Sequence, residues 1–316
     1  MVTIGVDIGG TSIKGAAVSD EGKISSTFSM PVYRDDNSEI TLRRLADTII
    51  NFIEGLNIKK EEIRGVGVGC PGAIDSGKGI VNYSNNLQWT NVHLKEFLEK
   101  ELGLPVRLTN DANAATLGEA KFGSGKIYNN VIMLTLGTGV GGGIIIDGKL
   151  YEGNEGKGAE LGHTVICVDG EECTCGRRGC LEAYSSATAL IRETKRLMTA
   201  HPSSYLWKLV DGDISKVNGK VAFDACKAGD KIGTQIVDWY VKYLGEGILN
   251  FCNIFRPDIV ILSGGIANQG DYLINKLTTY CKDRYYGYQR APKVEIKKAV
   301  LGYESGMIGA ASLFIK

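Results

Sequence analysis

The sequence lacks features that would attract a charged polymer or a lipid bilayer. Lys plus Arg and Asp plus Glu each number 36, so the formal net charge is zero and no basic surplus indicates a nucleic-acid partner. No apolar run approaches the roughly 18 residues that a membrane span requires. The N-terminus has no basic region followed by an apolar segment. We therefore expect a cytoplasmic protein with neither a nucleic-acid nor a membrane partner.

Histidine is also scarce, with only 3 in 316 residues, yet one of them stands close to a dense group of cysteines. His163 is followed by Cys173, Cys175 and Cys180, with two glycines between the last two cysteines. Imidazole and thiolate groups are good zinc ligands, and four of them complete a closed tetrahedral site. The alternative is three free cysteines in a glycine-rich loop beside an unrelated histidine. The density of ligands favours a structural zinc site.

Glycine, in contrast, is abundant, and much of it follows short apolar runs. The 42 glycines are about 13% of the chain, against a usual content of about 7%. Residues 2–8 read as a strand that ends in Gly9, Gly10 and Thr11, and residues 130–136 read as a strand that ends in a similar turn at 137–139. Such clusters indicate tight backbone turns at a ligand.

The order of predicted elements repeats at an offset of about 126–128 residues. Each half begins with three strands and continues with a strand that ends in glycine, then a strand followed by a helix. The predicted elements are strands at 2–8, 13–18, 23–30, 63–70, 106–109, 130–136, 140–146, 259–263 and 294–300, and helices at 38–58, 91–101, 110–122 and 305–314. Two copies of βββαβαβ predict a duplicated α/β architecture, with a mostly helical insertion at about 182–255. Ligands of such proteins lie between the halves.

The two glycine turns are candidate phosphate loops. A turn without Cβ atoms lets backbone N–H groups approach phosphate oxygens, and the Thr11 and Thr138 hydroxyls add donors. One such turn alone would more often be an ordinary hairpin, but two in duplicated positions favour a nucleotide. Asp7, at the end of the first strand, is placed to hold Mg²⁺ directly or through water. The predicted nucleotide-binding residues are Asp7, Gly9, Gly10, Thr11, Lys14, Gly137, Thr138, Gly139, Gly264 and Gly265.

Three further stretches allow a structural and a functional interpretation. Asn110 and Asp111 stand at a strand-to-helix junction, where either is a good helix N-cap; an ionised Asp111 there could also take a proton from a substrate hydroxyl. The glycine pair after Ser263 is a plain turn or a surface for an adenine ring. The polar loop at 85–89 could line a sugar pocket through Asn86 or be only a loop.

Together these residues resemble the ROK family of sugar kinases, within the actin-like/hexokinase/Hsp70 ATPase superfamily. The resemblance covers essentially the whole chain, and its cysteine motif is highly specific. The matching residues are Asp7–Thr11, Cys70–Gly72, Asn85–Leu87 with Trp89, Asn110, Asp111 and Asn113, Leu136–Gly142, Glu160 with His163, Cys173–Glu182 and Ser263–Gly265.

The resemblance implies a duplicated actin-like (ribonuclease H-like) fold of two domains with a cleft between them. We expect a small N-terminal domain at 1–112, on which a C-terminal helix at about 302–316 packs back. A larger domain at 113–301 would contain the zinc-braced loop at 160–182 and the helical insertion.

The resemblance also implies ATP-dependent phosphorylation of a hexose at its 6-hydroxyl, with Mg²⁺ bound to ATP. Glucose is the first expectation; N-acetylmannosamine, fructose, mannose and allose are alternatives. It implies that Asp111 is the general base and that structural zinc is held by His163, Cys173, Cys175 and Cys180. The residues expected to bind the sugar are Asn86, Asn110, Asp111, Glu160, His163 and Glu182.

A non-enzymatic sugar-sensing regulator is a hypothesis from another class. Repressors of this family carry an N-terminal helix-turn-helix domain, whereas the first phosphate hairpin here starts at residue 2, and Asp111 is retained. Both features argue against a regulator. Proteins of similar sequence are commonly homodimers or homotetramers, so we expect one of these two assemblies.

Overall fold

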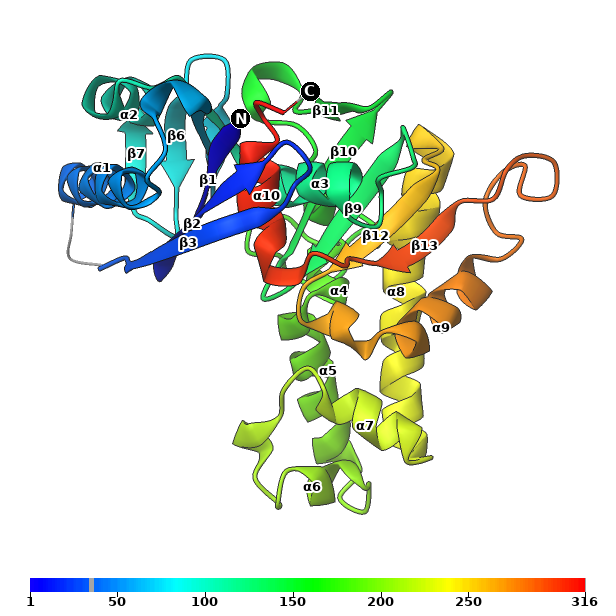
Figure 1. Cartoon of the computed structure of the whole chain (residues 1–316). Helices are drawn as coiled ribbons and strands as arrows, with labels where there is room; N and C mark the ends of the chain where they lie inside the picture. Colours follow the sequence, from blue (N-terminus) through cyan, green and yellow to red (C-terminus); the bar gives the residue numbers. More distant parts are fainter. Residues whose placement is uncertain (34–36, 316) are drawn as a thin grey trace. The chain divides into compact units, whose positions relative to one another are not determined.

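The protein is described by a computed structural model that covers residues 1–33 and 37–315 (Figure 1). Its internal contacts divide the chain into two compact units. The first contains residues 1–129, 143–159 and 300–316, and the second contains residues 130–142 and 160–299. The domain limits expected from the sequence, after residues 112 and 301, remain a prediction.

The first unit is built on a five-stranded sheet with the strand order β3-β2-β1-β4-β8. Strand β4 lies parallel to β1 and β8, whereas β2 lies antiparallel to β1 and β3. The strands are β1 (Val2–Ile8), β2 (Ser12–Ser19), β3 (Ile24–Pro31), β4 (Ile63–Cys70) and β8 (Val106–Asn110). The register places Asp7 opposite Lys14, so both side chains lie at the end of the sheet that carries the first glycine turn.

Helices cover both faces of this sheet, and the alternation of side chains along β1 explains how. Ile4, Val6 and Ile8 are fully buried in a core with the apolar faces of two helices. On the opposite face, a Cβ atom on Gly5 would lie 1.9 Å from the Met307 carbonyl oxygen, so a third helix packs directly on the strand backbone. These helices are α1 (Ser38–Gly55), α2 (Leu94–Leu102) and α10 (Ser305–Ala311), and α3 (Asp111–Phe122) packs beside α10 (Figure 1).

A three-stranded antiparallel sheet in the first unit was not predicted from the sequence. It consists of β5 (Ala73–Asp75), β6 (Ile80–Ser84) and β7 (Trp89–Val92). The strands are only 3 to 5 residues long, too short for a clear alternation of apolar and polar residues.

The second five-stranded sheet has the order β11-β10-β9-β12-β13. Its strands are β9 (Val131–Leu136), β10 (Val140–Ile146), β11 (Lys149–Tyr151), β12 (Ile259–Ser263) and β13 (Glu295–Lys298). The boundary between the two units falls within β10. When the strands of each five-stranded sheet are numbered in chain order, both sheets have the order third, second, first, fourth and fifth, which confirms the predicted duplication.

The second unit is rich in helices. They are α4 (Glu182–Ser185), α5 (Ala187–Ala200), α6 (Leu206–Leu209), α7 (Val221–Lys227), α8 (Lys231–Phe255) and α9 (Asp271–Cys281). Short 3-10 helices occur at Lys60–Glu62, Asn154–Gly156, Leu161–His163, Ile214–Lys216, Ile266–Gln269 and Gly302–Glu304. Among the helices in the described part of the chain, none combines the length and apolar character that crossing a membrane requires.

Candidate functional site

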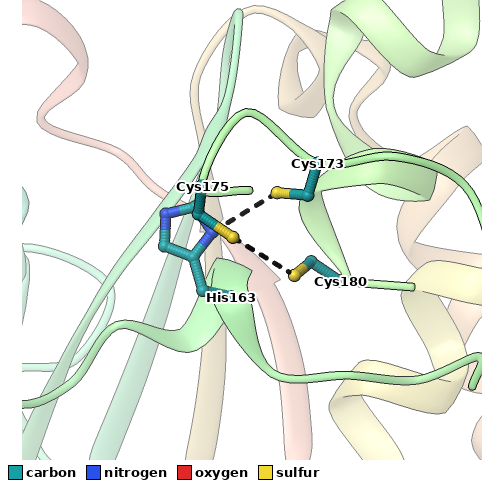
Figure 2. A group of neighbouring side chains, drawn as sticks. All are labelled: His163, Cys173, Cys175 and Cys180. Atoms are coloured by element: carbon teal, nitrogen blue, oxygen red, sulfur yellow. Dashed lines mark hydrogen bonds between the residues drawn. The ribbon is translucent and has the colours of Figure 1, made fainter. Parts of the chain in front are cut away.

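The structure brings the four predicted metal ligands together in the second unit. His163 ends a 3-10 helix, and Cys173, Cys175 and Cys180 come from the loop that follows. Their ligand atoms all lie within 4.8 Å of one another. Figure 2 shows the four side chains converging: the Cys175 and Cys180 sulfurs are 3.7 Å apart, and the Cys173 sulfur is 3.6 Å from His163 Nδ1.

These separations fit a tetrahedral zinc ion. Zinc binds sulfur at about 2.3 Å and nitrogen at about 2.0–2.1 Å, so tetrahedral geometry separates two sulfurs by about 3.8 Å and a sulfur from a nitrogen by about 3.5 Å. Backbone N–H donation from Arg177 lowers the pKa of the Cys175 thiol, whereas burial raises the pKa of Cys180 to about 12. A bound cation would stabilise all three thiolates. The donor set and its spacing therefore fit a closed, structural zinc site.

The loop that carries the cysteines is shaped by its own backbone. Gly176 and Gly179 adopt φ values of 86° and 82°, a left-handed conformation that favours glycine. The Cys173 N–H donates to the Arg177 carbonyl at 2.9 Å. Apolar packing against Tyr184, Trp239 and Tyr243 holds the loop in place.

Glu182 connects this loop to the second glycine turn. Its Oε1 accepts a hydrogen bond from the Thr174 hydroxyl at 2.9 Å, and its Oε2 accepts one from the Val140 N–H at 2.9 Å. A Cβ atom on Gly139 would lie 2.4 Å from Oε2, so only glycine allows this approach. One carboxylate thus holds both the cysteine loop and the turn at 137–139.

The other predicted glycine pair lies beside the same turn. Gly264 has a φ of 89°, and a Cβ atom there would lie 2.5 Å from the Leu136 carbonyl oxygen, at the end of β9. The structure therefore brings Gly264 next to Gly137, as expected if both contact one ligand. The Ala187 N–H, at the start of α5, donates to the Gly137 carbonyl at 2.8 Å and fixes the turn from another side.

In the first unit, the first glycine turn borders a cavity of about 550 Å³. Its lining includes the predicted residues Gly10, Thr11 and Asn86. It also includes Tyr33 and Gln88, which the sequence analysis did not single out. An aromatic ring among amide side chains is a surface suited to a sugar. The signal that could have found Gln88 was its place in the polar loop at 85–89.

Asp7 is the electrostatically unusual residue beside this turn. Burial, reinforced by the negative charge of Asp111 and opposed by Lys14, raises its pKa to about 6. Two nearby carboxylates that disfavour each other's ionisation form a site that a divalent cation would stabilise. The residues present therefore fit the Mg²⁺ predicted at Asp7.

Asn110 is the N-cap of α3, one of the two roles that its place at a strand-to-helix junction predicted. Its Oδ1 accepts hydrogen bonds from the Ala112 and Asn113 N–H groups at 2.8 and 3.3 Å, and its Nδ2 donates to the Gly72 carbonyl at 3.1 Å. Asp111 is the first residue of α3, where its Oδ1 accepts from the Ala112 N–H at 2.9 Å. Burial raises the pKa of Asp111, although N–H donors from the backbone and from Asn110 oppose the shift.

The predicted site residues fall in both units. Asp7, Gly9, Gly10, Thr11, Lys14, Asn86, Asn110 and Asp111 belong to the first unit, and Gly137, Thr138, Gly139, Glu160, His163, Glu182, Gly264, Gly265 and the three cysteines belong to the second. Within each unit, a glycine turn thus occurs together with candidate sugar-binding residues.

Two sheets of matching strand order and a cluster of one histidine and three cysteines define the class of α/β protein to which the chain belongs. The model of the ROK family matches residues 3–316, and the chain belongs to this family. It is 40% identical over 315 residues to the glucokinase of Thermotoga maritima, covering 98% of this chain and 96% of that protein.

A solved structure and a second kind of relative complete the comparison. The ROK family glucokinase of Streptomyces griseus, crystallised in complex with glucose and AMPPNP, has a TM-score of 0.80 and 35% identity over 99% of both chains. The xylose repressor of Bacillus spizizenii is 33% identical and aligns with 99% of this chain, but with only 77% of the repressor. The family therefore includes both sugar kinases and regulators.

Proposed function

We propose that this protein is an ATP-dependent glucokinase that transfers the γ-phosphoryl group of ATP to the 6-hydroxyl of glucose. The observation that carries the proposal is Asp111, a partly buried carboxylate with a raised pKa at the start of α3. Similarity to glucokinases over nearly the whole chain supports it.

Asp111 acts as the general base in this proposal. A raised pKa brings its proton affinity closer to the range in which a carboxylate exchanges protons efficiently near neutral pH. The N–H donors at the start of α3 keep it ionised and oriented. It accepts the proton of the sugar hydroxyl late in phosphoryl transfer, when bonding to phosphorus has made that hydroxyl acidic.

The two glycine turns hold the nucleotide. Backbone N–H groups at Gly10, Thr138 and Gly139, with the threonine hydroxyls and Lys14, bind phosphate oxygens. The Gly9 and Gly137 N–H groups donate to the Ser12 and Gly139 carbonyls and hold the turns in shape. Gly264 and Gly265 leave a flat surface for adenine. Mg²⁺, held through Asp7, neutralises charge on the phosphates when it is bound.

Asn86, Asn110, Glu160, His163 and Glu182 bind the sugar hydroxyls. His163 is able to serve both sites because its Nδ1 faces Cys173 in the metal cluster, leaving Nε2 for a hydroxyl. Four protein ligands would leave a bound zinc ion no open position, so its role would be to brace the loop and not to take part in the chemistry. Glu182, fixed at both oxygens, reaches the sugar only if its present hydrogen bonds are shared or exchanged.

The test is a coupled ADP-release assay with glucose, N-acetylmannosamine, fructose, mannose and allose, run with wild type and Asp111→Ala. Glucose should give the highest kcat/KM, and Asp111→Ala should give no turnover. If another sugar gave the highest kcat/KM, that sugar would replace glucose as the proposed substrate.

A sugar-sensing regulator is the second candidate, favoured by the similarity to a xylose repressor. The regulator would be favoured over the kinase if zinc-loaded protein bound a sugar but released no ADP in the presence of Mg²⁺, ATP and any of the five sugars.

A further inference from the structure

One buried carboxylate has no part in the chemistry proposed above. The Glu119 side chain, near the end of α3, is 0% exposed. Two other buried carboxylates, Asp75 and Glu193, are paired with Lys78 and Arg196. Both oxygens of Glu119 instead accept backbone N–H groups. Burying a carboxylate is unfavourable unless its hydrogen bonds are satisfied, so these two contacts account for its presence.

The two N–H groups come from segments that are far apart in the sequence. Glu119 Oε2 accepts from the Ser124 N–H at 2.9 Å, and Oε1 accepts from the Leu301 N–H at 2.7 Å. The Glu119 backbone carbonyl also accepts from the Gly123 and Gly125 N–H groups, which ends α3 at this point. A single residue therefore joins the end of α3 to two other stretches of chain.

Both stretches connect the first unit with the second. The chain first leaves the first unit after Asn129, five residues beyond Ser124, and enters it for the last time at Val300, one residue before Leu301. Glu119 thus fixes an outgoing and a returning connection to the same helix.

Helix α3 links this contact rigidly to Asp111. The helix begins at Asp111, and Glu119 follows eight residues later, so the two Cα atoms are separated by about 12 Å along the axis. It does not bend easily between the two residues, because α10 packs against this part of the helix closely enough that a Cβ atom on Gly309 would lie 1.6 Å from the Ala114 carbonyl oxygen. A displacement at Glu119 is therefore transmitted to Asp111 rather than absorbed within the helix.

We propose that Glu119 is a positioning residue for phosphoryl transfer. By holding the two connections against the end of α3, it sets the position of Asp111 together with the path of the chain into and out of the first unit. The inference rests on the proposed role of Asp111 as the base.

Two substitutions remove the contact from opposite sides. Glu119→Gln keeps the shape of the side chain but replaces one acceptor oxygen with an NH₂ group, which leaves an N–H facing a donor. Leu301→Pro deletes the N–H itself, and the φ of −77° at Leu301 suits proline. Each should lower kcat for glucose by about 10- to 100-fold, since small misplacements of catalytic groups have effects of this size. The KM for ATP should change less than about 3-fold, as expected when nucleotide binding is retained.

Asp230→Asn is the matched control. Asp230 also accepts two backbone N–H groups from separate segments, Tyr205 at 3.0 Å and Gly233 at 2.7 Å, but it lies in the helical part of the second unit. Asp230→Asn should lower the Tm by an amount similar to that of Glu119→Gln, but its kcat should stay close to that of the wild type. Hydrogen exchange at the Ser124 and Leu301 amides should accelerate in Glu119→Gln and remain unchanged in Asp230→Asn.

Combining Glu119→Gln with Leu301→Pro tests whether the two substitutions act on one contact. The double variant should lose no more kcat than the more impaired single variant, whereas independent effects would multiply. If Glu119→Gln fails to fold, Glu119→Asp, which keeps the charge on a shorter side chain, and Leu301→Pro take its place. Glu119→Asp should retain more kcat than Glu119→Gln.

Three results would overturn the inference. The first is a wild-type kcat in folded Glu119→Gln, and the second is an equal loss of kcat in Glu119→Gln and Asp230→Asn at an equal loss of Tm. The third is a loss of kcat in the double variant that equals the product of the two single losses. Loss of turnover in Asp111→Ala together with any of these would leave the proposed function standing. Turnover retained in Asp111→Ala would remove both this inference and the assignment of Asp111 as the base, while the kinase activity itself would stand.

Discussion

Glu182 accepts a hydrogen bond from the Val140 N–H at 2.9 Å, and this contact joins the cysteine loop to the second glycine turn. The other oxygen of the same carboxylate accepts from the Thr174 hydroxyl, between two of the metal ligands. In the proposed kinase these two regions serve the sugar and the nucleotide. Because the two regions share this carboxylate, a change at the cluster of candidate metal ligands should alter the position of the second glycine turn.

Substitution of Glu182 should therefore affect both substrates. We expect Glu182→Gln to lower kcat/KM for glucose and for ATP by about 10-fold or more, a change of about 1.4 kcal/mol per factor of ten. Steady-state kinetics with each substrate varied in turn would measure this. Thr174→Val, which removes only the loop side of the contact, should affect glucose more than ATP. An unchanged kcat/KM for ATP in Glu182→Gln would contradict the link.

Removing zinc should loosen the loop rather than stop the chemistry directly. We expect Cys175→Ala to lose bound zinc, to lower the Tm by about 5 °C or more, and to raise the KM for glucose. Elemental analysis, calorimetry and kinetics would establish the three effects. Cys167→Ala provides the control, because Cys167 packs beside the loop but lies outside the ligand set. Full activity in protein shown to be free of zinc would refute the structural role.

The raised pKa of Asp7 predicts a dependence of stability on pH. Because its pKa is about 6 in the folded protein and 3.8 ordinarily, the folded state binds the proton more tightly. The stabilisation is complete below about pH 4 and is lost as the pH rises through about 6, a change of about 3 kcal/mol. Asp7→Asn should consequently raise the free energy of unfolding of the ligand-free protein at pH 8 by up to this amount.

Urea unfolding of wild type and Asp7→Asn at pH 4 and pH 8 would test the prediction. The two proteins should differ at pH 8 and converge at pH 4. A constant difference across the range would mean that Asp7 is not the group responsible. Kinase activity of Asp7→Asn should be low at both values if Asp7 holds Mg²⁺.

The duplicated fold and the cluster of four candidate metal ligands were predictable from the sequence because both depend on local patterns. Apolar runs ending in glycine mark the strands of each half, and four soft ligands within eighteen residues mark the cluster. The same signals predicted the glycine turns, because a turn that must approach a ligand needs glycine wherever it stands.

The features that could not be predicted from the sequence depend on tertiary packing. The small sheet at 73–92 was missed because its strands are too short to show a period. Glu119 resembles any other helical glutamate in the sequence, and only the folded chain reveals that it is buried against Ser124 and Leu301. The electrostatic state of Asp7 likewise depends on its burial and on Asp111, over a hundred residues away.

The measurement that tests the central claim most directly is glucose-dependent ADP release by Asp111→Ala, with nucleotide binding measured on the same protein. General bases contribute typically 10²- to 10⁴-fold to rate, so turnover should fall by at least about 100-fold while ATP still binds and the Tm stays close to wild type. Turnover within about 10-fold of wild type would contradict the assignment of Asp111 as the base.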